Sequence, residues 1–160
     1  MQIIQVEGIG ALSMRTLATK LGIKAPSLYD HVKNRDQVIA LVQGAGLLDF
    51  GEGFTNAGAE PRDKILFYRE WALANPNLYP IVFQETLRRD SLPEGLEQKV
   101  LGLVVAASGG SHTQARVMWA QLHGLVDLEL QGRFPPDADL DATWEQAIIG
   151  IEATQKSNMA

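Results

Sequence analysis

Cysteine is missing from the 160 residues of this sequence. Its absence excludes disulfide frameworks, thiolate metal sites and cysteine nucleophiles. It also fits a reducing compartment, so we expect a cytoplasmic protein. The first 30 residues lack a basic stretch followed by an apolar one, which predicts no secretory signal. Apolar runs are short and broken by glycine, which predicts no membrane-spanning segment and no membrane partner.

The sequence also lacks the usual patterns of enzymes and metal sites. Its three histidines are far apart and have no metal-ligand spacing. No glycine-rich phosphate loop, nucleophile elbow or paired carboxylates stand out. The acidic cluster at residues 137–141 lacks a full calcium-loop pattern and is better suited to capping a helix. We therefore expect neither an enzyme nor a cofactor or metal ion.

The net charge of −5 is unevenly distributed along the chain. Residues 1–50 carry five basic and four acidic side chains, which leaves +1, and residues 51–160 carry the remaining −6. The basic residues of the first part lie between positions 15 and 35. This distribution indicates that a nucleic acid would be bound by a small local patch and not by the field of the whole protein.

Helical periodicity dominates the chain, and no alternating pattern bounded by hairpin turns predicts a strand. The sequence therefore predicts an all-α protein with two domains, residues 1–50 and 51–160. Four glycines between residues 44 and 53 predict that the helix from residue 35 to the mid-fifties kinks or frays. The predicted helices are the end of one at 2–8, then 14–21, 25–32, 35 to the mid-fifties, 62–75, 77–89, 92–107, 112–131 and 140 to about 156.

Residues 14–33 have the spacing of a helix-turn-helix. Ala18 is small where two helices must cross closely, and Gly22 suits a turn with a positive backbone angle. The predicted core positions are Leu17, Leu21, Ile23, Leu28 and Val32. Small residues at the start of the second helix would let it enter a major groove. Aromatic, imidazole and cationic side chains behind them can hold phosphates.

Residues 12–18 (LSMRTLA), 21–23 (LGI) and 25–35 (APSLYDHVKNR) closely resemble the head motif of the tetracycline-repressor (TetR) family of transcription regulators. The resemblance implies that Arg15 reads a base, plausibly guanine. It implies that Ala25, Pro26 and Ser27 form the recognition surface, and that Tyr29, His31 and Arg35 contact phosphates. We include Lys24, whose role is open, and Lys33 among the candidate DNA-binding residues.

The sequence departs from the family pattern in its first helix, which is cut to about two turns. We expect that the native start lies upstream of Met1. The other reading is a head with weakened DNA affinity. In that case the chain would be a helical ligand-binding or protein-interaction module with impaired DNA binding.

The helix predicted at residues 112–131 is apolar nearly all round, which requires cover on several sides. Together with the last helix it predicts a homodimer held by four helices, two from each subunit. Residues 119–124 (WAQLHG) also resemble a motif in one branch of TetR-type C-terminal domains. The tentative interface residues are Leu122, Leu125, Val126, Trp144, Ile148 and Ile151.

In the family, the body also binds a small molecule. Aromatic side chains at helical spacing more often form a packed core than line a pocket, although those of this body could do either. The tentative ligand-binding residues are Phe67, Trp71, Tyr79, Phe83, Met118, Trp119 and His123. The sequence thus predicts a bacterial, ligand-responsive repressor that binds a double-stranded DNA operator as a homodimer. The effector is of unknown identity.

Overall fold

Helices are the regular elements in residues 8–159, the part of the chain that the computed structural model describes, and no strand occurs there. The predicted all-α fold is confirmed. The helix end predicted at residues 2–8 lies outside the described residues except for Gly8. In chain order the elements are η1 (Ile9–Ala11), α2 (Met14–Leu21), α3 (Ala25–Tyr29), α4 (Arg35–Asn56), α5 (Pro61–Ala74), η2 (Pro80–Gln84), η3 (Arg89–Ser91), α6 (Leu96–Ala107), α7 (His112–Leu130) and α8 (Leu140–Met159).

Two compact units alternate along the sequence. The first unit contains the residues up to Asp49 together with Asn75–Glu97, and the second contains Phe50–Ala74 and Gln98–Ala160. Helix α4 contributes residues to both units, and the proposed domain boundary at residue 50 falls inside it. The division into domains 1–50 and 51–160 stays a prediction.

Helix α4 runs unbroken through its glycines, so the predicted fraying is wrong, while the kink stays a prediction. A methyl group on Gly46 would overlap Val82 within the first unit. One on Gly53 would overlap the ring of Phe67 within the second. These glycines therefore allow close approach of a neighbouring segment, and this packing outweighs their low helix propensity.

The helix predicted at residues 77–89 is also absent. Pro80 begins η2, a single π-helical turn that ends at Gln84, and the 3-10 turn η3 follows. Helix α6 begins at Leu96, after Pro93 and after Gly95, whose φ is +74°. Prolines lack the N–H that a continuous helix needs, so they divide this segment into short pieces.

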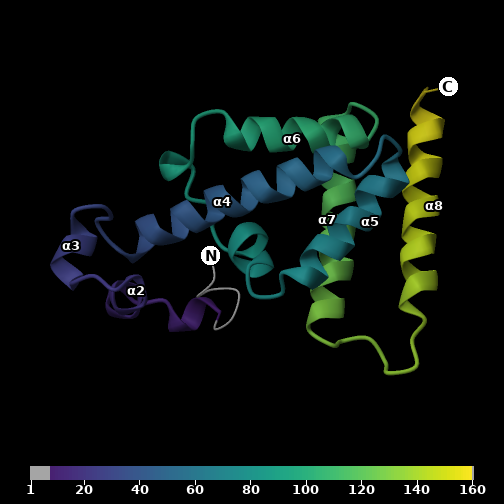
Figure 1. The fold of residues 1–160 in the computed structure, drawn as a ribbon. Helices are drawn as coiled ribbons and strands as arrows, with labels where there is room; N and C mark the ends of the chain where they lie inside the picture. Colours follow the sequence, from purple (N-terminus) through teal and green to yellow (C-terminus); the bar gives the residue numbers. More distant parts are fainter. Residues whose placement is uncertain (1–7, 160) are drawn as a thin grey trace. The chain divides into compact units, whose positions relative to one another are not determined.

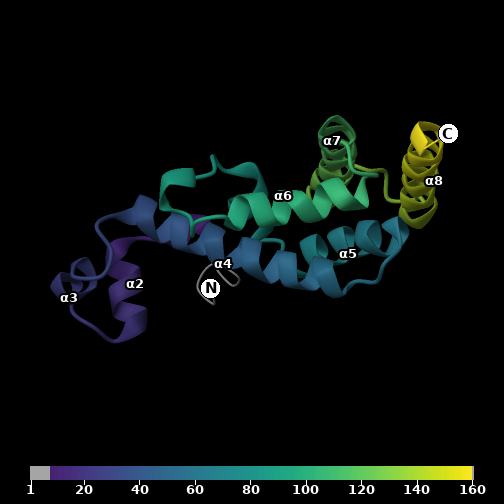
Figure 2. The ribbon, with the colours of Figure 1, turned by 90° about the horizontal axis from the view of Figure 1, so that it is seen from above.

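The second unit is built on α5, α7 and α8. Figure 1 shows α7 (green) and α8 (yellow) running antiparallel, and Figure 2 shows them side by side when viewed nearly end-on. Helix α5 packs against both. Ser111 caps α7 by accepting a hydrogen bond from the Gln114 N–H, and Asp139 caps α8 by accepting one from the Ala142 N–H at 2.9 Å. The predicted capping role of the acidic cluster is thus confirmed at Asp139.

Aromatic rings fill the core of the second unit. The Phe50 ring lies at 5.4 Å from those of Phe54 and Trp71, at 5.7 Å from Phe67 and at 5.9 Å from Tyr68, measured between centroids. The contacts of Phe50 with Tyr68 and Trp71, which both lie on α5, are edge-on, a geometry that aromatic pairs favour.

A charged network joins the three helices of the second unit. Arg69 of α5 pairs with Glu129 of α7 at 2.8 Å and with Asp141 of α8 at 2.7 Å. The indole N–H of Trp144 donates to the second oxygen of Glu129 at 2.7 Å. Because Arg69 and Glu129 are mostly buried and their hydrogen bonds are satisfied, the network fixes α5, α7 and α8 against one another.

Candidate nucleic-acid interface

Helix α2 begins and ends where its sequence predicts. The Ser13 hydroxyl accepts a hydrogen bond from the Thr16 N–H at 3.0 Å, and the Thr16 hydroxyl accepts one from the Ser13 N–H at 2.9 Å. This reciprocal pair is a capping box. Gly22 ends the helix with φ 67° and ψ 24°, a left-handed conformation that costs glycine least.

Helix α3 packs on α2, and the small, buried Ala18 lies in α2. Leu28 and Val32 are buried as predicted, whereas Leu17 is half-buried. The prediction for Leu21 and Ile23 is wrong, since they are 57% and 38% exposed. Helix α3 also ends at Tyr29, three residues earlier than predicted. Asn34 then starts α4 by accepting a hydrogen bond from the Gln37 N–H at 2.9 Å.

All nine candidate DNA-binding residues are exposed. Arg15 lies in the first turn of α2, Lys24 precedes α3, and Ala25, Pro26 and Ser27 form its first turn. Tyr29 (52% exposed), His31 and Lys33 follow along the chain. Residues 12–33 carry four cationic side chains and one carboxylate, so this surface has the charge that phosphates require.

Arg35 makes two hydrogen bonds that its sequence did not predict, and its phosphate contact stays a prediction. Its Nε donates to the Leu12 carbonyl at 3.0 Å, and its Nη2 donates to the Ile9 carbonyl at 3.1 Å. The guanidinium therefore ties the first turn of α4 to the segment just before α2. The guanidinium has five N–H donors, so three remain for a phosphate while Arg35 also braces the segment before α2.

The seven tentative ligand-binding residues are divided between the two units. Tyr79 and Phe83 belong to the first unit, and their rings pack on each other at 5.3 Å. Phe67 and Trp71 belong to the aromatic core of the second unit, which favours the core interpretation for these two. Met118 is buried against the groove between α7 and α8.

Trp119 and His123 are the tentative ligand-binding residues that lie together within reach of solvent. Trp119 is 43% exposed, and its ring lies 6.0 Å from that of His123. The Tyr68 hydroxyl is 3.4 Å from His123 Nδ1. Burial lowers the pKa of the His123 imidazole, and the Asp127 carboxylate opposes this shift. The neutral imidazole is thus the favoured form.

The tentative interface residues occupy the core of their own chain. Five of the six are buried, and Leu125 is half-buried. Ala115, Met118, Leu122 and Val126 form one buried stripe of α7 at helical spacing. A sequence does not reveal whether an apolar helix is covered by its own chain or by a second copy, and here α5 and α8 cover this stripe.

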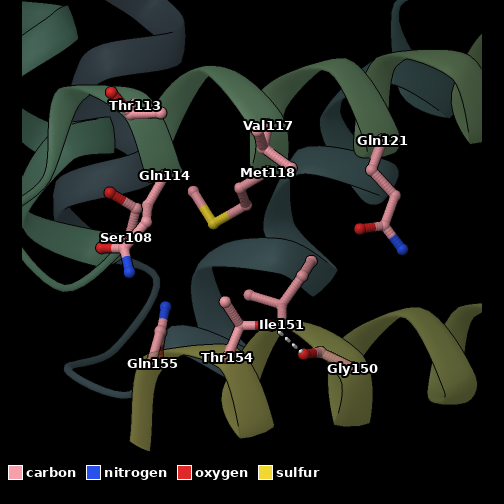
Figure 3. A pocket seen from close by; sticks show the side chains of 10 residues that line it. All are labelled: Ser108, Thr113, Gln114, Val117, Met118, Gln121, Gly150, Ile151, Thr154 and Gln155. Carbon is pink, nitrogen blue, oxygen red and sulfur yellow. Dashed lines mark hydrogen bonds between the residues drawn. The ribbon is translucent and has the colours of Figure 1, made fainter. Parts of the chain in front are cut away.

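An exposed face remains on α7 and α8. Val117 (64% exposed) and Leu128 lie on α7, and Ile149 lies on α8. Between the helices is a groove of about 150 Å³. Figure 3 shows Met118 and Ile151 pointing into the space between the helices. The groove is lined by Ser108, Thr113, Gln114, Val117, Met118, Gln121, Gly150, Ile151, Thr154 and Gln155.

Sequence reasoning missed two polar residues whose side chains are buried or nearly so, Gln43 and Glu129. Gln43 is 0% exposed and lies within an otherwise apolar stretch of α4, and Glu129 stands near the end of the mostly apolar α7. A lone polar residue in an apolar helical run was the available signal, because it must find a hydrogen-bonding partner when buried.

Membrane-spanning helices and clusters of metal-ligating side chains are both absent from residues 8–159. No helix there is long and apolar enough to cross a membrane. No group of three or more histidine and acidic side chains there could hold a metal ion.

Residues 65–150 match the family model described as tetracyclin repressor-like, C-terminal domain. The chain is 30% identical over 163 aligned residues to an uncharacterized HTH-type transcriptional regulator of Mycobacterium tuberculosis, covering 92% of this chain and 73% of the relative.

Two solved structures share the fold. One, described as a regulatory protein, has a TM-score of 0.75 at 21% identity, with 94% of this chain and 89% of that chain covered. The other is a transcriptional regulator from Streptomyces coelicolor A3(2), with a TM-score of 0.57 at 20% identity, covering 96% and 91%.

Proposed function

Since the chain belongs to the tetracycline-repressor-like family of transcription regulators, we propose that it represses transcription by binding a pseudo-palindromic DNA operator as a ligand-responsive homodimer. The family and the relatives make it a regulator and not an enzyme. The observation that carries the proposal is the exposed, cationic surface that runs from α2 through α3 to the start of α4 and presents all nine candidate residues to solvent.

In the proposed complex, α3 lies in the major groove. Its first turn consists of Ala25, Pro26 and Ser27, whose small side chains allow close approach to base edges. Arg15 is exposed on the first turn of α2, and no partner for its side chain is found among the described residues. It is therefore free to donate two hydrogen bonds to a guanine. Lys33 is exposed and suited to a phosphate.

A dimer would place two such helices in successive major grooves, about 34–36 Å apart. We assign its interface to the exposed face of α7 and α8, with Val117, Leu128 and Ile149, in place of the buried residues first considered. The apolar groove between the helices supports a second copy as its partner. The resemblance of residues 119–124 to one branch of the family's C-terminal domains stays a prediction.

For the effector, we place the first contacts at Trp119 and His123, since these two lie together and are accessible. Titrating aromatic small molecules while following tryptophan fluorescence tests this site. Trp71 and Trp144 are buried, so Trp119→Phe should remove most of the quenching by a binding compound. Unchanged quenching in Trp119→Phe would exclude the site.

The DNA proposal is tested by selecting duplexes from a random library with the whole protein and measuring affinity by fluorescence anisotropy. Arg15→Ala should relax preference at one base pair by about 1–3 kcal/mol. Lys33→Ala should weaken binding to all sequences and lower the salt slope by about one. The control Lys99→Ala changes an exposed lysine of α6 and should do neither.

Two outcomes would contradict the proposal. If the unchanged protein selects no sequence even at low salt, the chain fits the interaction-module reading instead. If Arg15→Ala keeps full sequence preference, the base-reading role of Arg15 is wrong while the regulator assignment stands.

A further inference from the structure

Residues 80–91 connect α5 to α6 through short, irregular pieces of the first unit. They comprise the π-helical turn η2, an extended stretch at residues 85–88 and the 3-10 turn η3. Backbone groups in such a segment have few partners from regular structure, yet they need hydrogen bonds when buried. The segment must therefore obtain them from elsewhere.

The side chain of Gln43 provides those hydrogen bonds from α4. Its Nε2 donates to the Ile81 carbonyl at 3.0 Å and to the Thr86 carbonyl at 3.2 Å. Its Oε1 accepts from the Arg88 N–H at 3.1 Å. Gln43 is 0% exposed, so loss of these bonds would leave buried polar groups without partners.

Two further contacts reinforce the attachment on α4. Gly46, three residues after Gln43, leaves room for Val82. Asp36 lies seven residues before Gln43, hence on the same face of the helix, and pairs with Arg88 at 3.0 Å. Residues 81–88 are thus held along about three turns of α4, with Gln43 as the buried centre.

The same first turn of α4 also contacts the segment just before α2. Arg35, next to Asp36, donates to the Leu12 and Ile9 carbonyls just before α2. A continuous series of contacts therefore connects Gln43 and residues 81–88, through Asp36 and Arg35, to the start of the helix that carries Arg15. All of these residues belong to the first unit.

We propose that Gln43 is a positioning residue for DNA binding. Its three hydrogen bonds hold residues 81–88 on α4, and this attachment sets the orientation of α2 and of Lys33 beside α4. Any effector or partner that pulls residues 81–88 away must break these bonds and thereby lowers DNA affinity. The inference rests on the proposed DNA-binding function and names a step in its regulation.

The experiment compares Gln43→Met, which keeps the volume but removes the bonds, with the control Gln98→Met at an exposed position of α6. The probe is a duplex selected by the unchanged protein. We expect Gln43→Met to weaken its binding about tenfold, a typical coupling between sites. Amide exchange at Arg88 and in α2 should become faster, and Gln98→Met should change neither.

Gln43→Glu allows a measurement, the pH dependence of DNA affinity, that loss of packing alone would not change. A buried carboxyl beside two carbonyl oxygens has a raised pKa, and its protonated form can donate one of the lost hydrogen bonds. The DNA affinity of this variant, relative to the unchanged protein at each pH, should therefore recover as pH falls. This variant also decides the question if Gln43→Met fails to fold.

Three outcomes separate the possibilities. If Gln43→Met binds the duplex as the unchanged protein does, or Gln43→Glu shows no relative recovery at low pH, the inference is overturned and the regulator assignment stands. If the unchanged protein selects no duplex, the proposed function fails. The inference is then judged by amide exchange in α2, and equal exchange in Gln43→Met and Gln98→Met overturns it.

Discussion

Three charged residues around the start of α4 perform three different tasks. Lys33 extends into solvent, Arg35 donates to two backbone carbonyls, and Asp36 pairs with Arg88. Their charges alone do not distinguish these tasks, because each depends on what the folded chain brings within about 3 Å of the side chain.

Exchanging Arg35 for lysine separates bracing from phosphate binding. Lysine keeps the charge but cannot donate to two carbonyls in the same fork geometry. We expect Arg35→Lys to lower stability by about 1–2 kcal/mol in urea unfolding. Lys33→Ala should leave stability unchanged and weaken DNA binding. If Arg35→Lys is fully stable, the bracing role is wrong.

His123 predicts how stability depends on pH. Burial lowers its pKa in the folded protein, so the unfolded chain binds more protons once pH falls below about 6.5. Stability present at neutral pH is therefore lost as pH falls through the folded pKa. Melting temperatures between about pH 7.5 and 5.5 should fall less in His123→Gln than in the unchanged protein. Equal slopes would rule out His123 as the cause.

At the level of elements, the sequence predicts what is local and misses what is tertiary. Ser13 with Thr16 and Gly22 define α2 within nine positions of each other, and the structure confirms both ends. The glycines of α4 misled the prediction because their partners, Val82 and Phe67, are distant in sequence. The two backbone bonds of Arg35 escaped the sequence analysis for the same reason, since Leu12 lies 23 residues away.

Substituting the glycines of α4 and α6 tests the close-packing interpretation. Gly46→Ala should destabilise the protein by about 1–3 kcal/mol, because its methyl group would overlap Val82. Gly102→Ala in α6 meets nothing within 4 Å and should stabilise by up to about 1 kcal/mol. Both are measured by urea unfolding at one fixed protein concentration. A stabilising Gly46→Ala would show that the helix gains more than the packing loses.

At the scale of the whole molecule, the apolar character of α7 and α8 predicted a dimer interface. Five of the six residues predicted for that interface are instead buried within a single chain. Val126 and Ile148 are buried, whereas Val117 and Ile149 remain exposed. The sequence therefore identified the helices of the proposed interface but not their faces. Which face is covered depends on α5, whose position follows from tertiary contacts such as that between Arg69 and Glu129.

Oligomeric state tests the revised interface. In sedimentation equilibrium, the unchanged protein should be a dimer and Val117→Glu a folded monomer, because an unpaired carboxylate would be buried in the interface. The affinity of Val117→Glu for the operator should also fall, because the dimer is lost. Leu101→Glu changes another exposed apolar residue, on α6, and should remain dimeric. A dimeric Val117→Glu, or a monomeric unchanged protein, would contradict the proposal.

The alternation of the two compact units along the chain limits how this regulator can be re-engineered. A chimera that exchanges residues 1–50 with a related regulator would import a foreign α4 and separate Gln43 from Ile81, Thr86 and Arg88. The DNA-reading part is therefore not a detachable module. Transplanting specificity should succeed with the exposed side chains of α2 and α3 alone, or with residues 75–97 carried along as part of the graft.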